Sequence, residues 1–136
     1  MKRIVESLAC LPVMAPASVS ASTGTTSGYV DASGADEVVF VVSAAPLGAG
    51  KSLTVTLLAA GDDSGSDAQE LGEAVFTDAA GTEAQTAVVS YRPDPQQGRY
   101  VAVKFQHDAA AAVVCSVVAL AGQIYRPAEN GWTMMV

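Results

Sequence analysis

Aromatic and charged side chains are both scarce in this chain. Of its 136 residues, 6% are aromatic and 15% are charged, whereas half are hydrophobic. A chain of this length fits about one domain and buries about two thirds of its unfolded surface. Because Ala and Val supply most of the hydrophobic fraction, the composition favours pleated sheets over a core built on large aromatic anchors.

Basic side chains are few as well. Seven Lys and Arg stand against 14 Asp and Glu, which gives a net charge of −7. The seven cations are scattered along the sequence, and the excess of carboxylates repels phosphate backbones. We therefore expect no nucleic-acid partner.

Reactive side chains are limited to two cysteines and one histidine. Cys10 and Cys115 show neither CxxC nor Cys/His ligand spacing, which favours two buried thiols over a disulfide and favours a reducing compartment. A single histidine excludes a two-His metal site. His107 precedes Asp108, but neighbours on a strand point to opposite faces, so we favour a structural histidine at a strand end over a catalytic pair.

Two loops imitate ligand sites. Residues 45–52 satisfy a relaxed Walker pattern, yet a phosphate-binding loop must open a helix, and an alternating strand at 53–57 follows instead. Residues 62–67 offer oxygen ligands for Ca²⁺, with Glu73 at the twelfth position counted from Asp62. However, Asp67 stands at the sixth position, where an EF-hand needs Gly. We expect no catalytic residue, cofactor site or metal site, and hence no enzyme.

The N-terminal residues 1–22 imitate an export signal, with a basic start, an apolar middle and small residues near Ala21. Glu6, Pro12 and Pro16 interrupt the apolar core that such a signal needs. No apolar run approaches the roughly 20 residues that a membrane-spanning helix requires, so we expect no membrane partner. We interpret residues 1–27 as an ordered arm.

Alternating and β-branched runs indicate strands along most of the chain. The run VVFVV at 38–42 and the alternation at 53–57 are the clearest, and Gly, Pro and Asp mark the turns. These patterns predict an all-β protein, an antiparallel β-sandwich of jelly-roll type with extended N- and C-terminal arms, whose sandwich spans 28–127. Further strands are expected at 29–30, 73–77, 86–91, 99–106 and 112–124.

Two of these strands, at 38–42 and 113–118, are apolar on both faces, whereas a plain sandwich strand has one wet face. The N-terminal arm, the C-terminal tail at 128–136 or another protein is therefore expected to cover the second face. Trp and Met favour contacts between proteins, and the tail carries both, although folding back onto its own sandwich is an equal alternative. The candidate partner-contact residues are Leu11, Val13, Met14, Trp132, Met134 and Met135.

The order of these apolar runs and turns resembles the capsid cement (decoration) proteins of tailed bacteriophages, above all those of podoviruses. The resemblance covers about residues 28–127, and neither arm matches a motif. The stretches that carry it are YVDASG at 29–34, EVVFVVS at 37–43, LTVTL at 53–57, AVFT at 74–77, RYVAV at 99–103 and the segment 117–127 that ends in YRP.

The resemblance implies a jelly-roll protein on the outer surface of an icosahedral capsid, where it cements neighbouring major capsid subunits of HK97-like fold. Members of the family act as dimers or trimers, and a homodimer is expected here. The implied location is the virion, after assembly in the host cytoplasm. An acidic exterior and a sheet with two apolar faces fit this role, since repeated weak contacts gain avidity on a lattice. The alternative is an exported bacterial β-sandwich, either an adhesin or a carbohydrate-binding module.

Overall fold

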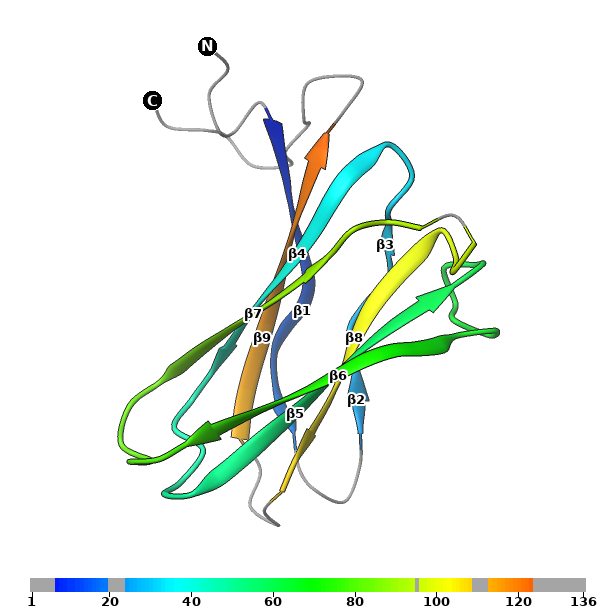
Figure 1. Cartoon of the computed structure of the whole chain (residues 1–136). Coiled ribbons are helices and arrows are strands. Elements are labelled where there is room, and N and C mark those ends of the chain that lie inside the picture. Colours follow the sequence, from blue (N-terminus) through cyan, green and yellow to red (C-terminus); the bar gives the residue numbers. More distant parts are fainter. Residues whose placement is uncertain (1–6, 20–23, 95, 109–112, 124–136) are drawn as a thin grey trace.

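Two antiparallel sheets pack face to face as a β-sandwich (Figure 1). The computed structural model describes residues 7–19, 24–94, 96–108 and 113–123. The four-stranded sheet has the order β1 (Leu8–Val19), β9 (Val113–Gln123), β4 (Ala35–Ala44) and β7 (Gln85–Tyr91). The five-stranded sheet has the order β2 (Thr25–Thr26), β8 (Tyr100–His107), β5 (Lys51–Ala60) and β6 (Gln69–Asp78), and β3 (Val30–Asp31) also pairs with β8.

The all-β antiparallel sandwich predicted from the sequence is confirmed, whereas the jelly-roll subtype stays a prediction. The strands predicted between residues 29 and 124 are each present, with ends a few residues away from those expected. Among the described residues, no helix has the length and hydropathy needed to cross a bilayer.

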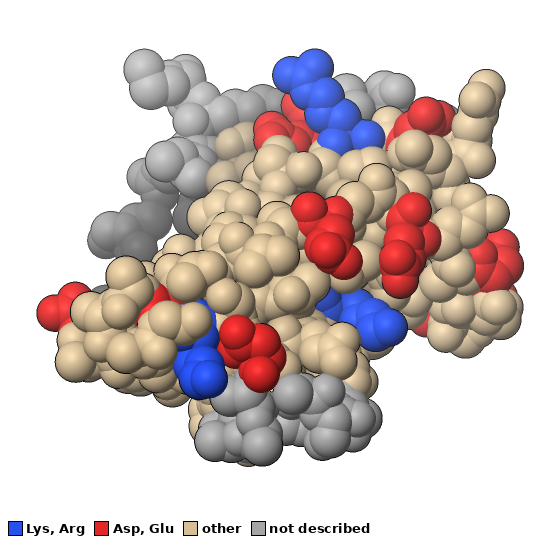
Figure 2. All heavy atoms as spheres, turned by 60° about the horizontal axis from the view of Figure 1, so that its bottom comes forward, with Lys and Arg blue, Asp and Glu red and all other residues tan. Residues whose placement is uncertain are grey.

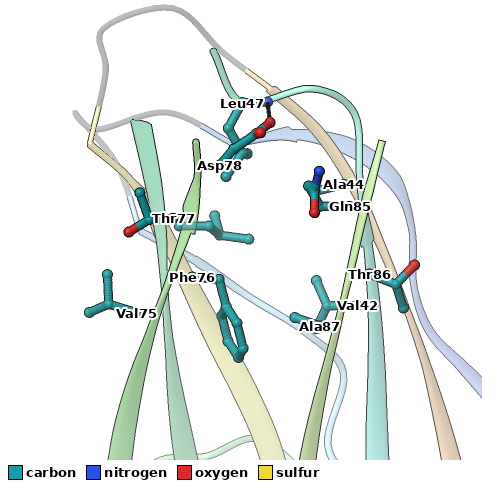
Figure 3. A pocket seen from close by; sticks show the side chains of 11 residues that line it. Val42, Ala44, Leu47, Val75, Phe76, Thr77, Asp78, Gln85, Thr86 and Ala87 are labelled. Carbon is teal, nitrogen blue, oxygen red and sulfur yellow. Dashed lines mark hydrogen bonds between the residues drawn. The ribbon is translucent and has the colours of Figure 1, made fainter. Parts of the chain in front are cut away.

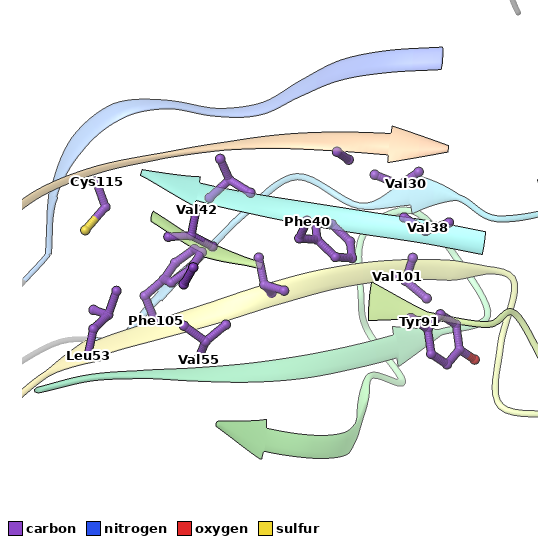
Figure 4. Close-up of a cluster of buried hydrophobic side chains, with 14 of the residues drawn as sticks. Val30, Val38, Phe40, Val42, Leu53, Val55, Tyr91, Val101, Phe105 and Cys115 are labelled. Atoms are coloured by element: carbon purple, nitrogen blue, oxygen red, sulfur yellow. The ribbon is translucent and has the colours of Figure 1, made fainter. Parts of the chain in front are cut away.

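Alternation along the strands builds the core between the two sheets. On β8, Val101, Val103 and Phe105 are fully buried, as their spacing predicts. They meet the equally buried Phe40 and its neighbours on β4 (Figure 4). Small and β-branched side chains fill the rest of this layer, which agrees with the low aromatic content.

Part of the predicted N-terminal arm is a strand. Residues Leu8–Val19 form β1, which pairs with β9 along the outer edge of the four-stranded sheet. The pairing shifts register between Pro12 and Met14 and again between Met14 and Ala17, as expected for a strand that contains prolines. Val19 is fully buried. This segment therefore extends the sheet in its own plane and does not lie over either face, while the tail at 128–136 lies outside the described residues.

Asp78 closes one end of the sandwich. It is 3% exposed, and its carboxylate accepts hydrogen bonds from the backbone N–H groups of Gly81 at 2.8 Å and Leu47 at 3.1 Å. Gly81 has a φ of 71°, and a Cβ there would collide with the backbone of Ala49. One carboxylate thus joins the β6–β7 turn to the β4–β5 connection.

Candidate functional site

The outward faces of the two sheets differ in polarity. In the five-stranded sheet, Thr54 pairs with Gln106 and Thr56 pairs with Lys104, and these side chains point away from the core. Glu73 of β6 continues the second row. This face is therefore more polar than its counterpart, although it also carries Val75 of β6, which pairs with Thr54 and is 57% exposed.

The outward face of the four-stranded sheet carries two neighbouring apolar rows, followed by a polar row of Ser43, Thr86 and Ser116. In one row across it, Val41 of β4 lies between Val118 of β9 and Val88 of β7, and Pro12 of β1 pairs with Val118. In the next row, Val39 pairs with Leu120. We call this surface the apolar face and define it by Pro12, Val39, Val41, Val88, Val118 and Leu120.

The described residues leave the apolar face open to solvent. Val88 is 58% exposed and Val118 is 40% exposed, although both are β-branched and large. The expectation that strands 38–42 and 113–118 are apolar on both sides is confirmed, because Val117 and Val42 face the core from the same strands. Contiguous exposed apolar surfaces are often sites of interaction.

A hollow of about 290 Å³ lies at one end of the apolar face, next to Val39 and Leu120. Its rim is acidic, with the carboxylates of Asp36 and Glu37. Glu37 accepts a hydrogen bond from the Ser90 hydroxyl. The Asp36 carboxylate lies over Gly122, so that any Cβ at that glycine would collide with it. The full lining is Ser7, Leu8, Asp36, Glu37, Val39, Leu120 and Gly122.

Charges are dispersed over the rest of the surface. Figure 2 shows acidic side chains spread over one side of the molecule and basic side chains separated from one another. One ion pair joins β3 to the start of β8, where Arg99 Nη2 lies 2.7 Å from Asp31 Oδ2 and Nε lies 2.9 Å from Oδ1. This hydrogen-bonded pair lowers the pKa of Asp31 and raises that of Arg99. Its role is to hold two strands together.

The acidic loop at 61–67 is organised mainly by the carboxylate of Asp62, while Asp67 accepts a hydrogen bond from the Gly61 N–H. Asp62 accepts hydrogen bonds from the N–H groups of Ser64, Gly65 and Ser66 and from the hydroxyl groups of both serines. These bonds, led by that of Ser66, lower the pKa of Asp62 to about 2. In the described part of the chain, no group of three or more His, Cys, Asp or Glu side chains is placed to hold a metal ion.

The backbone N–H groups of the Walker-like loop donate hydrogen bonds within the protein. The N–H of Leu47 donates to Asp78, and the N–H of Lys51 donates to the carbonyl of Gly48 at 3.0 Å. The loop leads into β5, as the alternating pattern predicts, and no helix opens there. Its backbone amides therefore serve the turn and not a phosphate.

His107 and Asp108 point to opposite sides, as predicted. His107 is 2% exposed, whereas Asp108 is exposed and accepts a hydrogen bond from the Ser52 N–H at 2.9 Å. A distance of 3.9 Å separates His107 Nε2 from Asp108 Oδ1, which is longer than a hydrogen bond. The pair lacks the geometry of a catalytic dyad.

The three predicted contact residues of the N-terminal arm lie on β1, away from the apolar face. Leu11 is 36% exposed and pairs with the buried Ala119, so it lies on the opposite side of the sheet. Val13 and Met14 are partly buried against the core. The other three, Trp132, Met134 and Met135, lie outside the described residues.

The sequence alone did not indicate which residues of β1 lie on the apolar face. Pro12 and Cys10 do so, because they pair with Val118 and Leu120. The signal that could have located this face is the double-sided apolar pattern of β4 and β9, combined with the exposed valine of β7. Register decides the rest, and register cannot be taken from one sequence.

The two cysteines differ in environment. Cys115 is buried, and burial raises the pKa of its thiol. Cys10 is exposed, so the expectation of two buried thiols is wrong for Cys10, whose place on an edge strand opens it to solvent. Both are free. Cys10 pairs with Leu120, and the five residues from there to Cys115 span about 17 Å of strand.

A second hollow lies between the two sheets, where β6 and β7 are their outer strands (Figure 3). It has a volume of about 270 Å³ and is lined by Val42, Leu53, Phe76 and Ala87, with Asp78 at one end. Phe76 points into it. This volume falls slightly below the roughly 300 Å³ at which small-molecule pockets begin.

Comparison with known proteins identifies the fold. No protein-family model and no curated protein matches the sequence. Among solved structures, the PBSX exported protein XepA has a TM-score of 0.58 and 9% identity over the whole of this chain, which spans 44% of that chain. A carbohydrate-binding module from glycoside hydrolase family 9 (Cel9A) of Ruminococcus flavefaciens FD-1 has a TM-score of 0.52 and 12% identity, covering 85% of this chain and 98% of the module. At such identities the likeness concerns the β-sandwich alone.

Proposed function

We propose that this chain is a structural virion protein that binds the outer surface of an icosahedral phage capsid and cements neighbouring major capsid subunits of HK97-like fold. The observation that carries the proposal is the apolar face. The sequence resemblance to phage cement proteins supplies the partner, and the action of a cement requires a surface and not an active site.

The size of the apolar face favours a repeated partner over a single one. Four strands give a width of about 20 Å, and two apolar rows give a length of about 14 Å, hence roughly 280 Å². A stable protein interface buries about 800 Å² on each partner. One such face therefore makes a weak contact, and many copies on a lattice turn weak contacts into firm attachment.

The difference between the two sheets supports one-sided attachment. The apolar face packs on the shell, while the polar face with Thr54, Lys104 and Gln106 stays in water. The net charge of −7 disfavours contact with DNA, which suits an external position. Attachment as a homodimer doubles the buried area and is part of the proposal.

The test is co-sedimentation of the purified protein with expanded, undecorated capsids. Val118→Lys places a charge in the centre of the apolar face and is expected to weaken binding at least about tenfold, since burying an unpaired charge is costly. Thr54→Lys is the matched control, because it adds the same charge at a central position of the opposite, polar face. Equal binding by both variants, or no binding by the unmodified chain, contradicts the proposal.

Carbohydrate binding is the second candidate, favoured by the similarity to the carbohydrate-binding module. Sugar-binding surfaces commonly use exposed aromatic rings, and the described apolar face contains none. An exported form would also need cleavage after Ala21, which removes β1 and uncovers the edge of β9. Retention on insoluble polysaccharide, together with an intact mass that lacks residues 1–21, would favour this candidate.

A further inference from the structure

The outer strands of the two sheets differ in how well they are protected against pairing with another chain. Natural sheets protect such strands with prolines, bulges, charges or short length. Strand β1 contains Pro12 and Pro16 and shifts register twice, and β2 and β3 have two residues each. Strand β6 carries the exposed Glu70 and Glu73 and shifts register against β5. Each of these edges is therefore protected.

Strand β7 has none of these protections. Its seven residues, QTAVVSY, include no proline and no charge, and they pair with β4 without a register shift. In the described part of the chain, no strand pairs with the other edge of β7. We propose that this edge pairs with the same edge of a second copy of the chain, so that two four-stranded sheets join into one sheet.

The length of β7 defines the register in which two copies pair most completely. In an antiparallel pair related by a twofold axis, the central residue of the seven-residue strand lies opposite itself, so Val88 meets Val88 of the second copy. Thr86 then lies opposite Ser90, and all seven residues have a partner. Residues that lie opposite each other point to the same face of a sheet, so the outward side chains of both copies share one surface.

This register joins the apolar faces of the two copies. Within one copy, a row of the apolar face reaches the edge of the sheet in the order Pro12, Val118, Val41 and Val88. The second copy continues this row from its own Val88. Two faces of roughly 280 Å² thus become one of roughly 560 Å². Because the pairing lies in the plane of the sheet, the joined surface stays free for another partner.

Charges on either side of β7 favour the same arrangement. Glu83 precedes the strand by two residues, Arg92 follows it directly, and both are exposed. In an antiparallel pair, the start of one strand lies beside the end of the other. Glu83 of one copy therefore lies near Arg92 of the second copy, and the twofold axis repeats this contact. A parallel pair would bring like charges together.

The core is incompletely closed on the side of β7. A hollow of about 180 Å³ lies between the sheets there, and Val55, Leu57 and Val89 are among the residues that line it. Val89 and Phe76 are only partly buried. In the proposed register, Val89 lies opposite Ala87 of the second copy on this inner side. Pairing therefore adds apolar cover where the single sandwich lacks it.

This pairing deepens the proposed function, because it supplies the homodimer that attaches to the shell. It rests on the proposed function for that role alone, since the pairing itself is argued from the edge strands.

Sedimentation equilibrium of the purified chain at neutral pH tests the dimer. We expect the unmodified chain and the control Val118→Lys to be dimeric, because Val118 lies two strands away from the edge. Val88→Lys should raise the dissociation constant at least about tenfold, since two lysines would lie opposite each other on the axis. Far-ultraviolet circular dichroism verifies that each variant is folded.

Mixing two variants tests the register. Val88→Glu alone should weaken the dimer as Val88→Lys does, because like charges again meet on the axis. A mixture of Val88→Lys and Val88→Glu should form a heterodimer, in which lysine lies opposite glutamate. Native mass spectrometry identifies this heterodimer by its mass.

A charge exchange tests the contacts beside the strand. Glu83→Lys and Arg92→Glu should each raise the dissociation constant about fivefold, because each change affects two exposed contacts in the dimer. The double variant Glu83→Lys/Arg92→Glu restores opposite charges and should restore the original constant. Additive losses in the double variant overturn the antiparallel arrangement.

Three further results overturn the inference. The first is a chain that stays monomeric at millimolar concentration. The second is dissociation by Val118→Lys, which would assign the dimer to stacked apolar faces. The third is a mixture of the two Val88 variants that forms no heterodimer. These measurements use no capsids. A chain that passes them and fails to co-sediment keeps the inference and loses the proposed function, whereas a monomer that co-sediments does the reverse.

Discussion

Asp78 is the polar side chain on which the closed end of the sandwich depends. Its carboxylate accepts one hydrogen bond from Leu47, 31 residues earlier in the chain, and one from Gly81, three residues later. Asp78→Ala leaves both N–H groups without this acceptor in a buried place. We expect a loss of about 2 kcal/mol in the free energy of unfolding, measured by urea titration.

The control for this variant is Asp63→Ala, which removes an exposed carboxylate from the 61–67 loop. It should change the urea midpoint little, because substitutions on the surface stay within about 0.5 kcal/mol. Similar losses in both variants would mean that the effect reflects overall charge and not the buried hydrogen bonds.

The Asp31–Arg99 pair should make stability depend on pH in the acid range. Because Arg99 lowers the pKa of folded Asp31 below its ordinary value of 3.8, the pair stabilises the fold above that pH and loses its contribution as the pH falls through the lowered pKa. Both side chains are substantially exposed, so solvent screening limits the effect. We expect Asp31→Asn to cost about 0.5 kcal/mol at neutral pH.

Urea titrations of the Asp31→Asn variant at neutral pH and near pH 3 test this dependence. The difference from the unmodified chain should shrink at the lower pH, where Asp31 of the unfolded chain is protonated. A penalty that stays constant across this range would show that the amide disturbs the turn at Ser33, whose N–H bonds to Asp31, and not the ion pair.

Some features at the residue scale could be predicted from the sequence. The opposite orientations of His107 and Asp108 follow from the alternation of side chains along any strand. The Walker-like loop leads into a strand and not a helix, which already indicated that it does not bind phosphate. The exposure of Cys10 could not be predicted from the sequence, because it depends on β1 being an outer strand. A residue's own pattern carries no information about which strands become edges.

Removal of strand β1 should destabilise the molecule. Val19 is fully buried, and the strand covers the whole edge of β9. A chain lacking residues 1–21 loses the burial of Val19 and Ala9 and the pairing with β9. We expect a loss of at least about 3 kcal/mol, or a fall in the melting temperature of roughly 10 °C.

Differential scanning calorimetry measures this loss, and a chain lacking only residues 1–6 is the matched control, since it keeps every described strand. Equal melting temperatures in the two truncated chains would show that β1 is dispensable. The same result would reopen the alternative of an exported protein cleaved after Ala21.

Strand β1 is difficult to predict from the sequence because prolines usually interrupt strands. Pro12 and Pro16 argue against a central strand, and they are compatible with an outer one in which the register shifts. Strands β4, β5 and β8 were predictable for the opposite reason: unbroken alternation or β-branched runs leave few other conformations.

Acidic pH should bring whole molecules together. The net charge of −7 keeps molecules apart at neutral pH, and this repulsion vanishes near the isoelectric point of about 4.4. There we expect association through the apolar face, and light scattering should rise. The double variant Val88→Lys/Val118→Lys should scatter less than the unmodified chain when each is measured at its own isoelectric point.

The control is Thr54→Lys/Gln106→Lys, which adds the same two charges to the polar face. It should scatter like the unmodified chain at its own isoelectric point. If both double variants suppress association equally, charge alone governs it and the apolar face has no special part.

At the scale of the whole molecule, composition and alternation sufficed for the β-sandwich, and double-sided strands pointed to an uncovered surface. The location of that surface needed the pairing of β4 with β9 and β7, since four short apolar patterns become one face only when their registers align.

The shifted pairing of β1 has a consequence for how copies can meet. Prolines lack the N–H that a neighbouring strand would need, and a bulged rim cannot align with a straight one. Two sandwiches therefore cannot pair edge to edge through β1 to form one continuous sheet. Neighbouring molecules can touch there through side chains while each keeps its own boundary, which disfavours growth into fibrils.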